Sequence, residues 1–277
     1  MKKSLKKLFY TAFIPFIALI VVSCVTPFRV GEPDTTAVDE DKINEAKRHY
    51  SLGVIAYESK NYDEALINLN RSLDLYGGDT EGEAKVRLKR AQVYSKQGNL
   101  DLATADIKRV IALSYNLPEA HYENAVIYYK KGDTEGALKE LETATTIDER
   151  YAPAYNLKGI IYKSTGKLEL ALEEYGKAII NDDTFAQSYF NRALVYFEQK
   201  NYTSALTDFS SAISKYSEGQ KEYMAYAYCK RAEVFMMLGN PKMAERDRDK
   251  ANKLHPGLCG EGINREPDWG KGEFRSD

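Results

Sequence analysis

The side chains in this sequence that most readily do chemistry are three histidines and three cysteines. His49, His121 and His255 lie too far apart in the chain to form an HExxH zinc motif. No pair of cysteines has zinc-binding spacing, and the sequence has no GxSxG nucleophile motif and no glycine-rich phosphate loop. Neighbouring acids such as Glu173 and Glu174 are spaced for a solvated helix surface. The sequence therefore predicts a protein that is not an enzyme and binds no metal or cofactor.

The first 24 residues have the pattern of a secretory signal. Four lysines within the first seven residues precede an apolar run over residues 8–22. The run has 15 residues and contains Pro15, so it is short for a membrane-spanning helix, which needs about 20 apolar residues. It ends in the small residue Ser23 followed by Cys24, which indicates a cleavage site.

This ending, Val21-Val22-Ser23-Cys24, resembles the lipobox of bacterial lipoproteins. The resemblance implies that residues 1–23 are a signal peptide that is removed and that the thiol of Cys24 carries diacylglycerol. Val25 in the next position, rather than Asp, resembles lipoproteins that travel to the outer membrane and face the periplasm. An ordinary signal peptide and an uncleaved anchor are the alternatives.

Charge and composition limit the partners of the mature chain. Without residues 1–23 the chain carries 35 basic and 41 acidic residues, a net charge of minus 6, and nucleic acid is therefore an unexpected partner. Attachment to the membrane would rest on the N-terminal lipid rather than on basic residues. Residues 24–41 contain proline and several acids without apolar periodicity, which predicts a flexible acidic tether.

Small residues recur along the rest of the chain and predict the elements that build it. Six alanines follow one another at intervals of 38, 34, 34, 34 and 39 residues: Ala65, Ala103, Ala137, Ala171, Ala205 and Ala244. Twelve residues before each lies a second small residue: Gly53, Ala91, Ala125, Gly159, Ala193 and Ala232. A 34-residue period of small residues is typical of a helix-turn-helix solenoid.

Between the two small residues of each repeat the sequence predicts a turn. Four glycines are placed to adopt the left-handed conformation that ends a first helix: Gly98, Gly132, Gly166 and Gly239. Lys60 and Lys200 take that position in two repeats. The next residue is Asn or Asp in five repeats and can cap the second helix: Asn61, Asn99, Asp133, Asn201 and Asn240. Lys167 departs from this rule.

The pattern resembles the tetratricopeptide repeat family, whose repeats share these small residues and an aromatic residue three positions after the first of them. The resemblance implies an all-α, right-handed α-solenoid of six helix-turn-helix repeats over residues 42–258. The six copies span residues 46–79, 84–117, 118–151, 152–185, 186–219 and 225–258. Two short insertions, at 76–81 and 217–220, fall between helices.

Two departures within the repeats have structural interpretations. Arg248 takes a position that is apolar or aromatic in the other five repeats, within a helix over 242–254 that is charged on most sides. We interpret this helix as the polar C-terminal cap that a solenoid needs, with Arg248 in solvent. His49 and His121 share one position of the first and third repeats, where family members have a large core-facing residue, and are interpreted as packing residues.

In this family the first helices line a concave groove, and two positions seven residues apart face it. The odd repeats hold aromatic pairs there: Tyr50 and Tyr57, Tyr122 and Tyr129, Phe190 and Phe197. The fourth repeat holds Asn156 and Lys163. These residues predict a groove that binds an extended or helical protein segment, with ordinary packing between repeats and a dimer surface as alternatives. The Lys and Asn clamp of chaperone-binding members is replaced here by Tyr50 and Val54, so that function is not carried over.

The last repeat contains the two remaining cysteines. Cys229 lies early in its first helix and Cys259 just beyond the end of its second, and antiparallel helices bring these ends together. A disulfide in an oxidising compartment and two separate thiols are the alternatives. Residues 259–277 are rich in glycine and charge, with Trp269 and Phe274 among them, and predict a disordered tail, read either as a frayed terminus or as a short docking motif.

The combined features predict a lipid-anchored scaffold that binds envelope proteins or peptides and helps to assemble a multiprotein complex. The resemblance implies two more specific roles. One is pilotin-like assembly of an outer-membrane secretin or type IV pilus, and the other is an adaptor for periplasmic proteases or peptidoglycan hydrolases. An enzyme or a small-ligand carrier is the remaining class, and it would need a pocket that the repeat pattern does not indicate.

Overall fold

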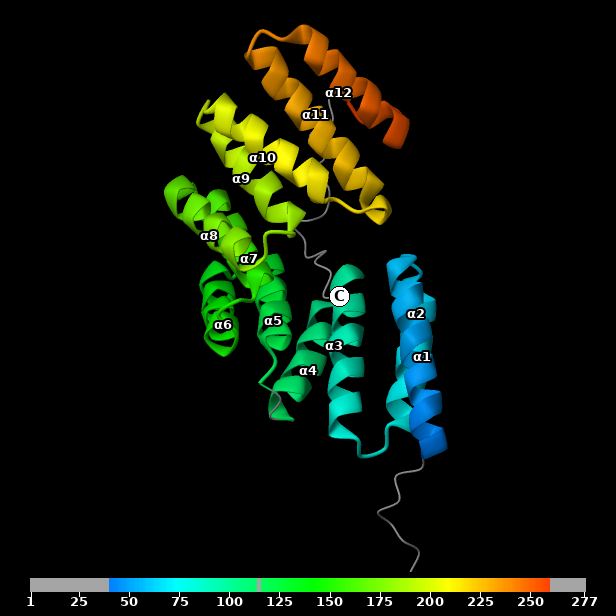
Figure 1. Cartoon of the computed structure of the whole chain (residues 1–277). Coiled ribbons are helices and arrows are strands. Elements are labelled where there is room, and N and C mark those ends of the chain that lie inside the picture. The colour runs from blue at the N-terminus through cyan, green and yellow to red at the C-terminus, as the bar shows by residue number, and fades with distance from the viewer. Residues whose placement is uncertain (1–39, 114–115, 260–277) are drawn as a thin grey trace, which may run out of the picture. The chain divides into compact units, whose positions relative to one another are not determined.

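The computed structural model describes residues 40–113 and 116–259, and Figure 1 shows that these residues form helices joined by short turns. The described residues contain no strand, twelve α-helices and one 3-10 turn, η1 (Glu218–Gln220). The α-helices are α1 (Glu40–Glu58), α2 (Tyr62–Leu75), α3 (Thr80–Lys96), α4 (Leu100–Ala112), α5 (Pro118–Lys130), α6 (Thr134–Ile147), α7 (Ala152–Ser164), α8 (Leu168–Asn181), α9 (Ala186–Glu198), α10 (Tyr202–Lys215), α11 (Lys221–Met237) and α12 (Pro241–Leu254).

The helices form six pairs, and each pair is one repeat. Every helix packs against the next one along the chain, and the contact is most extensive within a pair, such as α1 with α2 or α11 with α12. First helices of neighbouring repeats also touch, from α1 and α3 through to α7 and α9. The fold is therefore the all-α solenoid of helix pairs that the repeat pattern predicts.

The small residues lie where the two helices of a pair come closest. All six alanines of the second helices are fully buried. They are joined in the core by the large residue four positions later, in five of six repeats: Leu69, Ile107, Leu141, Tyr175 and Phe209. The spacing of four places both residues on one face of the second helix. In the sixth repeat Arg248 is exposed, as expected for a capping helix.

The turns have the predicted backbone geometry in every repeat. The four turn glycines have φ between 72 and 81°. Lys60 and Lys200 adopt the same left-handed conformation, with φ of 61°, although a side chain disfavours it. The predicted caps bond to the third helical amide at Asn61, Asp133, Asn201 and Asn240. Asn99 is the exception, because its side chain makes no capping bond and its Nδ2 donates to Gln97 instead.

Three predicted boundaries move. Helix α1 begins at Glu40, so the last two residues of the predicted tether, Glu40 and Asp41, are helical. Acids in a first turn interact favourably with the helix dipole, which explains the earlier start. The two insertions lengthen the first helices that follow them: α3 and α11 have 17 residues, whereas α5, α7 and α9 have 13. Four extra residues amount to about one helical turn.

Buried ion pairs connect the two helices of several repeats. In the second repeat Arg90 Nε lies 2.7 Å from Asp106 Oδ2. The fifth and sixth repeats place an arginine and an aspartate at the same two positions, sixteen residues apart, with Nε–Oδ2 distances of 2.7 Å: Arg192 with Asp208 and Arg231 with Asp247. The three aspartates are at most 5% exposed. These pairs satisfy charges that would otherwise be buried alone.

In the first and third repeats a histidine, rather than an arginine, connects the first helix to the second. His49 Nδ1 lies 3.1 Å from Asn68 Oδ1, and His121 Nδ1 lies 2.8 Å from Glu140 Oε2. Asn68 and Glu140 occupy the second-helix position that holds an aspartate in the repeats with arginine. The two predicted packing histidines are thus partly buried and tie the helices of a repeat together.

Several predictions concern residues outside the described part of the chain. The signal peptide, the lipidation of Cys24, the tether up to residue 39 and the tail over residues 260–277 all lie there. Within residues 40–113 and 116–259, no helix combines the length and the apolar character that a membrane crossing requires.

Candidate protein-binding surface

One side of the first helices carries the residues that the sequence assigns to binding. The two predicted positions are seven residues apart, which places them on one stripe of each helix. We call this stripe the first-helix face. It consists of Tyr50, Tyr57, Leu88, Ser95, Tyr122, Tyr129, Asn156, Lys163, Phe190, Phe197, Cys229 and Met236.

Five of the predicted binding residues are partly exposed there: Tyr50, Tyr57, Tyr129, Lys163 and Phe197. Tyr57 packs against Tyr62 with ring centroids 6.0 Å apart, and Phe197 packs against Tyr202 at 5.7 Å. Burial raises the pKa of the Tyr50 hydroxyl above its ordinary value. These rings therefore belong partly to the core of their own repeat and partly to the surface.

Three predicted groove residues are buried, and the prediction that they line a groove is wrong. Tyr122 is 2% exposed and meets Tyr151 edge-on at 5.8 Å. Phe190 is fully buried and packs against Phe209 and Tyr226.

Asn156 is also fully buried, and its Oδ1 accepts hydrogen bonds from Ser188 Oγ at 3.3 Å and Asn191 Nδ2 at 3.0 Å. The bonds of Asn156 reach into the following repeat, as does the ring contact of Phe190 with Tyr226. Tyr122 belongs to one core cluster with Ala154 and Leu157 of α7. In the third, fourth and fifth repeats the first of the two positions is therefore used for packing between neighbouring repeats, which was the alternative interpretation.

A cluster of lysines borders the first-helix face at α3 and α5. We call Lys89, Lys96 and Lys130 the lysine cluster. Lys89 Nζ lies 5.1 Å from the ring centroid of Tyr57, in cation–π geometry. Lys130 Nζ donates to the backbone oxygen of Ser95 at 2.9 Å and to its Oγ at 3.0 Å.

One buried carboxyl group accompanies the lysine cluster. Glu123 is 6% exposed, and its Oε1 accepts a hydrogen bond from Gln92 Nε2 at 2.7 Å. Burial raises the pKa of Glu123, and the three lysines partly offset this by stabilising the carboxylate. Burial likewise lowers the pKa of Lys89, against the attraction of Glu123 and Glu58. Around α3 and α5 the surface thus combines aromatic rings with an excess of positive charge.

These residues could have been found from the sequence. Lys89 and Lys96 are seven residues apart, and so are Glu123 and Lys130, each one position beyond the two predicted binding positions. A search for non-repeating charges beside the aromatic stripe would have identified them. The recurring arginine and aspartate sixteen residues apart are a second signal that the period alone did not reveal.

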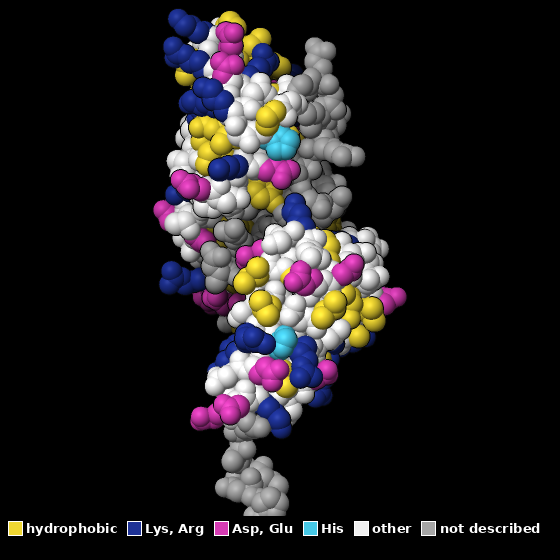
Figure 2. Space-filling model, turned by 90° about the vertical axis from the view of Figure 1, so that its right-hand side faces the viewer, with side chains coloured by type: hydrophobic (Ala, Val, Ile, Leu, Met, Phe, Trp, Pro, Cys, Tyr) yellow, Lys and Arg dark blue, Asp and Glu magenta, His cyan; other side chains and the backbone are white. Residues whose placement is uncertain are grey.

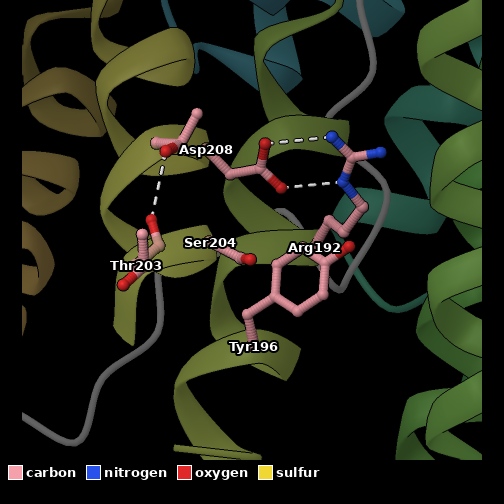
Figure 3. A pocket seen from close by; sticks show the side chains of 6 residues that line it. Arg192, Tyr196, Thr203, Ser204 and Asp208 are labelled. Carbon is pink, nitrogen blue, oxygen red and sulfur yellow. Dashed lines mark hydrogen bonds and ion pairs between the residues drawn. The ribbon is translucent and has the colours of Figure 1, made fainter. Parts of the chain in front are cut away.

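A shallow hollow of about 210 Å³ lies between α9 and α10. Figure 3 shows Arg192 and Asp208 facing each other across two contacts, with Tyr196 and Ser204 beside them. Because Asp208 accepts from Arg192 Nε at 2.7 Å and from Nη2 at 2.9 Å, the charge of the guanidinium is already matched. The hollow therefore has a structural ion pair as its floor and does not present an open anion site.

The last repeat contains the disulfide that the sequence left as one of two alternatives. Cys229 on α11 and Cys259 after α12 are bonded, with Cα atoms 5.4 Å apart. Leu258 packs against the core cluster around Phe190 and Tyr226 as well as against the cluster around Cys229. The chain after α12 therefore returns to α11 and is fastened at a position of the first-helix face.

Other surfaces carry less specific features. Figure 2 looks onto the side on which α1 and α2 lie in Figure 1 and shows apolar side chains scattered among charges. The exposed large apolar residues of these two helices are Leu52, Ile55 and Ile67. In the described part of the chain, no group of three or more His, Cys, Asp or Glu side chains is placed to hold a metal ion.

Comparisons with known proteins agree with this architecture. Solved structures of three proteins share the fold. PilF of Pseudomonas aeruginosa is 14% identical, with a TM-score of 0.61 over 78% of this chain and 95% of that chain. PilW, described as a widely conserved type IV pilus biogenesis factor, is 15% identical, with a TM-score of 0.60 over 76% and 94%. A thermophilic TPR protein of Thermus thermophilus is 22% identical, with a TM-score of 0.58 over 69% and 99%.

At these identities the likeness shows the fold alone. No curated protein matches the chain by sequence. A TPR repeat model matches residues 125–166 and 159–200, and two tetratricopeptide repeat models match residues 187–219 and 84–116. With the period of the small residues, the paired helices and these matches in agreement, the chain is a tetratricopeptide repeat protein.

Proposed function

We propose that this protein is a scaffold that binds segments of other proteins along its first-helix face and holds them in a complex. The observation that carries this proposal is the partly exposed set of aromatic rings and lysines on α1, α3 and α5, with Tyr57, Lys89 and Tyr129 among them. Tyrosine provides a large contact area with a polar tip, and lysine attracts carboxylates. A partner segment with apolar and acidic side chains fits this surface best.

We further propose that the scaffold is anchored by lipid to the outer membrane and faces the periplasm. The Val-Val-Ser-Cys sequence that ends at Cys24 supports this location, and residues 25–39 would separate the lipid from α1. A Cys24→Ser variant is expected to lose its partition into the detergent phase and to keep its signal sequence. Unchanged partition would remove the lipid anchor from the proposal.

A role in assembling a type IV pilus machine is the more specific candidate. PilW is described as a type IV pilus biogenesis factor, and the likeness to PilW and PilF extends over 94% and 95% of those chains. The adaptor role toward proteases or peptidoglycan hydrolases fits the same surface. We propose no catalytic role, because the exposed residues of the first-helix face include no nucleophile with an adjacent base.

Crosslinking in native envelopes, followed by identification of the attached proteins, tests the proposed function. A Tyr129→Ala, Phe197→Ala double variant is expected to lose partners while keeping its helical circular dichroism. Ile180→Ala is the matched control, because Ile180 is 84% exposed on the second helix α8. If the double variant and the control capture the same partners as the unchanged protein, the first-helix face is not the binding surface. Crosslinks to pilus assembly proteins would favour the first specific role, and crosslinks to hydrolases the second.

A further inference from the structure

We propose that residues 260–277 of this same chain bind the first-helix face, fastened by the Cys229–Cys259 disulfide and directed toward the lysine cluster. This inference rests on the proposed role of the first-helix face as a surface for protein segments. It adds that the chain provides its own ligand, which an external partner must displace.

The disulfide places the start of the segment on the correct side of the fold. Cys229 is one of the first-helix-face residues, and the bond holds Cys259 to it. Leu258 is packed against the cluster that contains Phe190 and Tyr226, from α9 and α11. Cys259, the last described residue, therefore lies next to the first-helix face of the last repeat, and not at the free end of α12.

The length of the segment matches the distance to the lysine cluster. Packed helices lie about 8–10 Å apart, so the four steps from α11 back to α3 amount to about 40 Å. The 18 residues from 260 to 277 can extend to about 60 Å. Trp269, ten residues beyond Cys259, can reach about 33 Å, which covers the distance to α5.

The chemistry of the segment also matches the surface. Residues 260–277 contain five acids and three bases, a net charge of minus 2, and two aromatic rings, Trp269 and Phe274. The lysine cluster, in which Lys96 Nζ is buried, borders the first-helix face, and the ring of Tyr129 is partly exposed on it. Lys89 is desolvated, which lowers the pKa of its ammonium group, and an added carboxylate would stabilise its charge.

Tethering makes even weak binding effective. A short linker gives its own segment an effective concentration on the order of 1 mM. If the free peptide binds with a Kd of about 0.1 mM, the tethered segment then occupies the surface in about nine of ten molecules. A partner that binds tightly would displace the segment, whereas a weak competitor would not. The segment would thus select for partners of sufficient affinity.

Trp269 provides a direct test, because it is the one tryptophan of the whole sequence. Acrylamide quenching of its fluorescence would be measured in the full chain and in a synthetic peptide of residues 260–277. We expect protection from quenching and a blue-shifted emission in the full chain. In a variant with all three lysines of the cluster changed to Glu, we expect quenching to rise to the value of the peptide. The matched control changes Lys108 and Lys139 to Glu, because both are exposed on second helices, and should keep the protection.

Each remaining outcome overturns the inference. Equal quenching in the full chain and in the peptide would show that the segment does not bind. Protection that survives in the cluster variant, with circular dichroism unchanged, would place the binding site elsewhere. Since this measurement needs no partner, its failure is distinct from failure of the proposed function, which would appear as an absence of crosslinked proteins. A chain that stops after Cys259 should capture more of any crosslinked partner than the full chain does.

Discussion

Replacement of Gly159 by alanine tests whether the small residues of the repeat are required by close helix contact. Gly159 lies on α7 opposite Tyr175 of α8, whose side chain is fully buried. A Cβ atom at Gly159 would lie 2.5 Å from Cε1 and 2.6 Å from Cδ1 of this ring. Carbon atoms in favourable contact are about 3.5–4.0 Å apart, so the ring or the helix would have to move by about 1 Å.

Two opposing effects set the expected size of the change. Overpacking a well-packed core destabilises by about 1–3 kcal/mol. Alanine is favoured over glycine inside a helix by about 1 kcal/mol. We therefore expect Gly159→Ala to lower the free energy of unfolding by about 1 kcal/mol, toward 2 if the ring cannot move.

A second glycine in the same repeat separates the two effects. Gly176 lies in α8, and an added Cβ there would meet only Arg192 Nη1, at 4.0 Å. Gly176→Ala should therefore stabilise the protein by about 1 kcal/mol through helix propensity. The free energy of unfolding would be measured by urea titration followed by circular dichroism. The two alanine variants should change it in opposite directions and differ from each other by about 2 kcal/mol.

A double variant then tests the contact itself. Gly159→Ala together with Tyr175→Leu reproduces the pair Ala125 and Leu141 of the third repeat, which is fully buried. In a double-mutant cycle the two changes should compensate each other by about 1 kcal/mol or more, because neighbours in contact are coupled. If Gly159→Ala is as stable as the unchanged protein, or if the two changes add independently, close contact does not explain the period of small residues.

Three further predictions concern other parts of the fold. Asp247→Asn leaves Arg231 without its buried partner and should lower the free energy of unfolding by about 3 kcal/mol in a urea titration, as is typical of broken buried pairs. Burial raises the pKa of Glu123 in the fold above its unfolded value. The stabilising contribution of Glu123 is therefore complete below the unfolded pKa and is lost as pH rises through the folded pKa. Relative to Glu123→Gln, the unchanged protein should lose stability in thermal melts as pH increases. Changing Cys229 and Cys259 to Ser opens a bridge between residues 30 apart and should lower the free energy of unfolding by roughly 3–4 kcal/mol by the chain-entropy model, measured against the oxidised protein.

The architecture could be predicted from the sequence because the same structural residues recur in each repeat. The spacing of the alanines, the turn glycines and the four working caps are local requirements of helix packing and helix ends, and they recur in six copies. Lys200 replaces the turn glycine, and its backbone still adopts the left-handed conformation of that position. The helix boundaries were less predictable, because the insertions could either lengthen a loop or extend a helix, and they extended α3 and α11.

The binding surface was harder to predict, because packing and binding use the same kinds of side chain. Tyr122 and Tyr129 share one stripe of α5, yet the first is buried against the next repeat and the second is partly exposed. The spacing of two residues in the sequence shows that they lie on one stripe of a helix, but it does not show how far each side chain is buried by the neighbouring helix. Burial depends on the residue opposite, as Tyr151 is for Tyr122, and that residue lies outside the helix that carries the stripe.

Charges that do not recur are the better guide to where a partner binds. A position beside the stripe is free to vary from repeat to repeat. One such position holds Glu58, Lys96, Lys130, Ser164, Glu198 and Met237 in the six successive repeats. Since neighbouring repeats stack, the two lysines lie on adjacent first helices, while the last repeats present an acid and an apolar side chain. Residues 260–277, which follow the disulfide of the last repeat, would as proposed run from α11 toward the two lysines on α3 and α5.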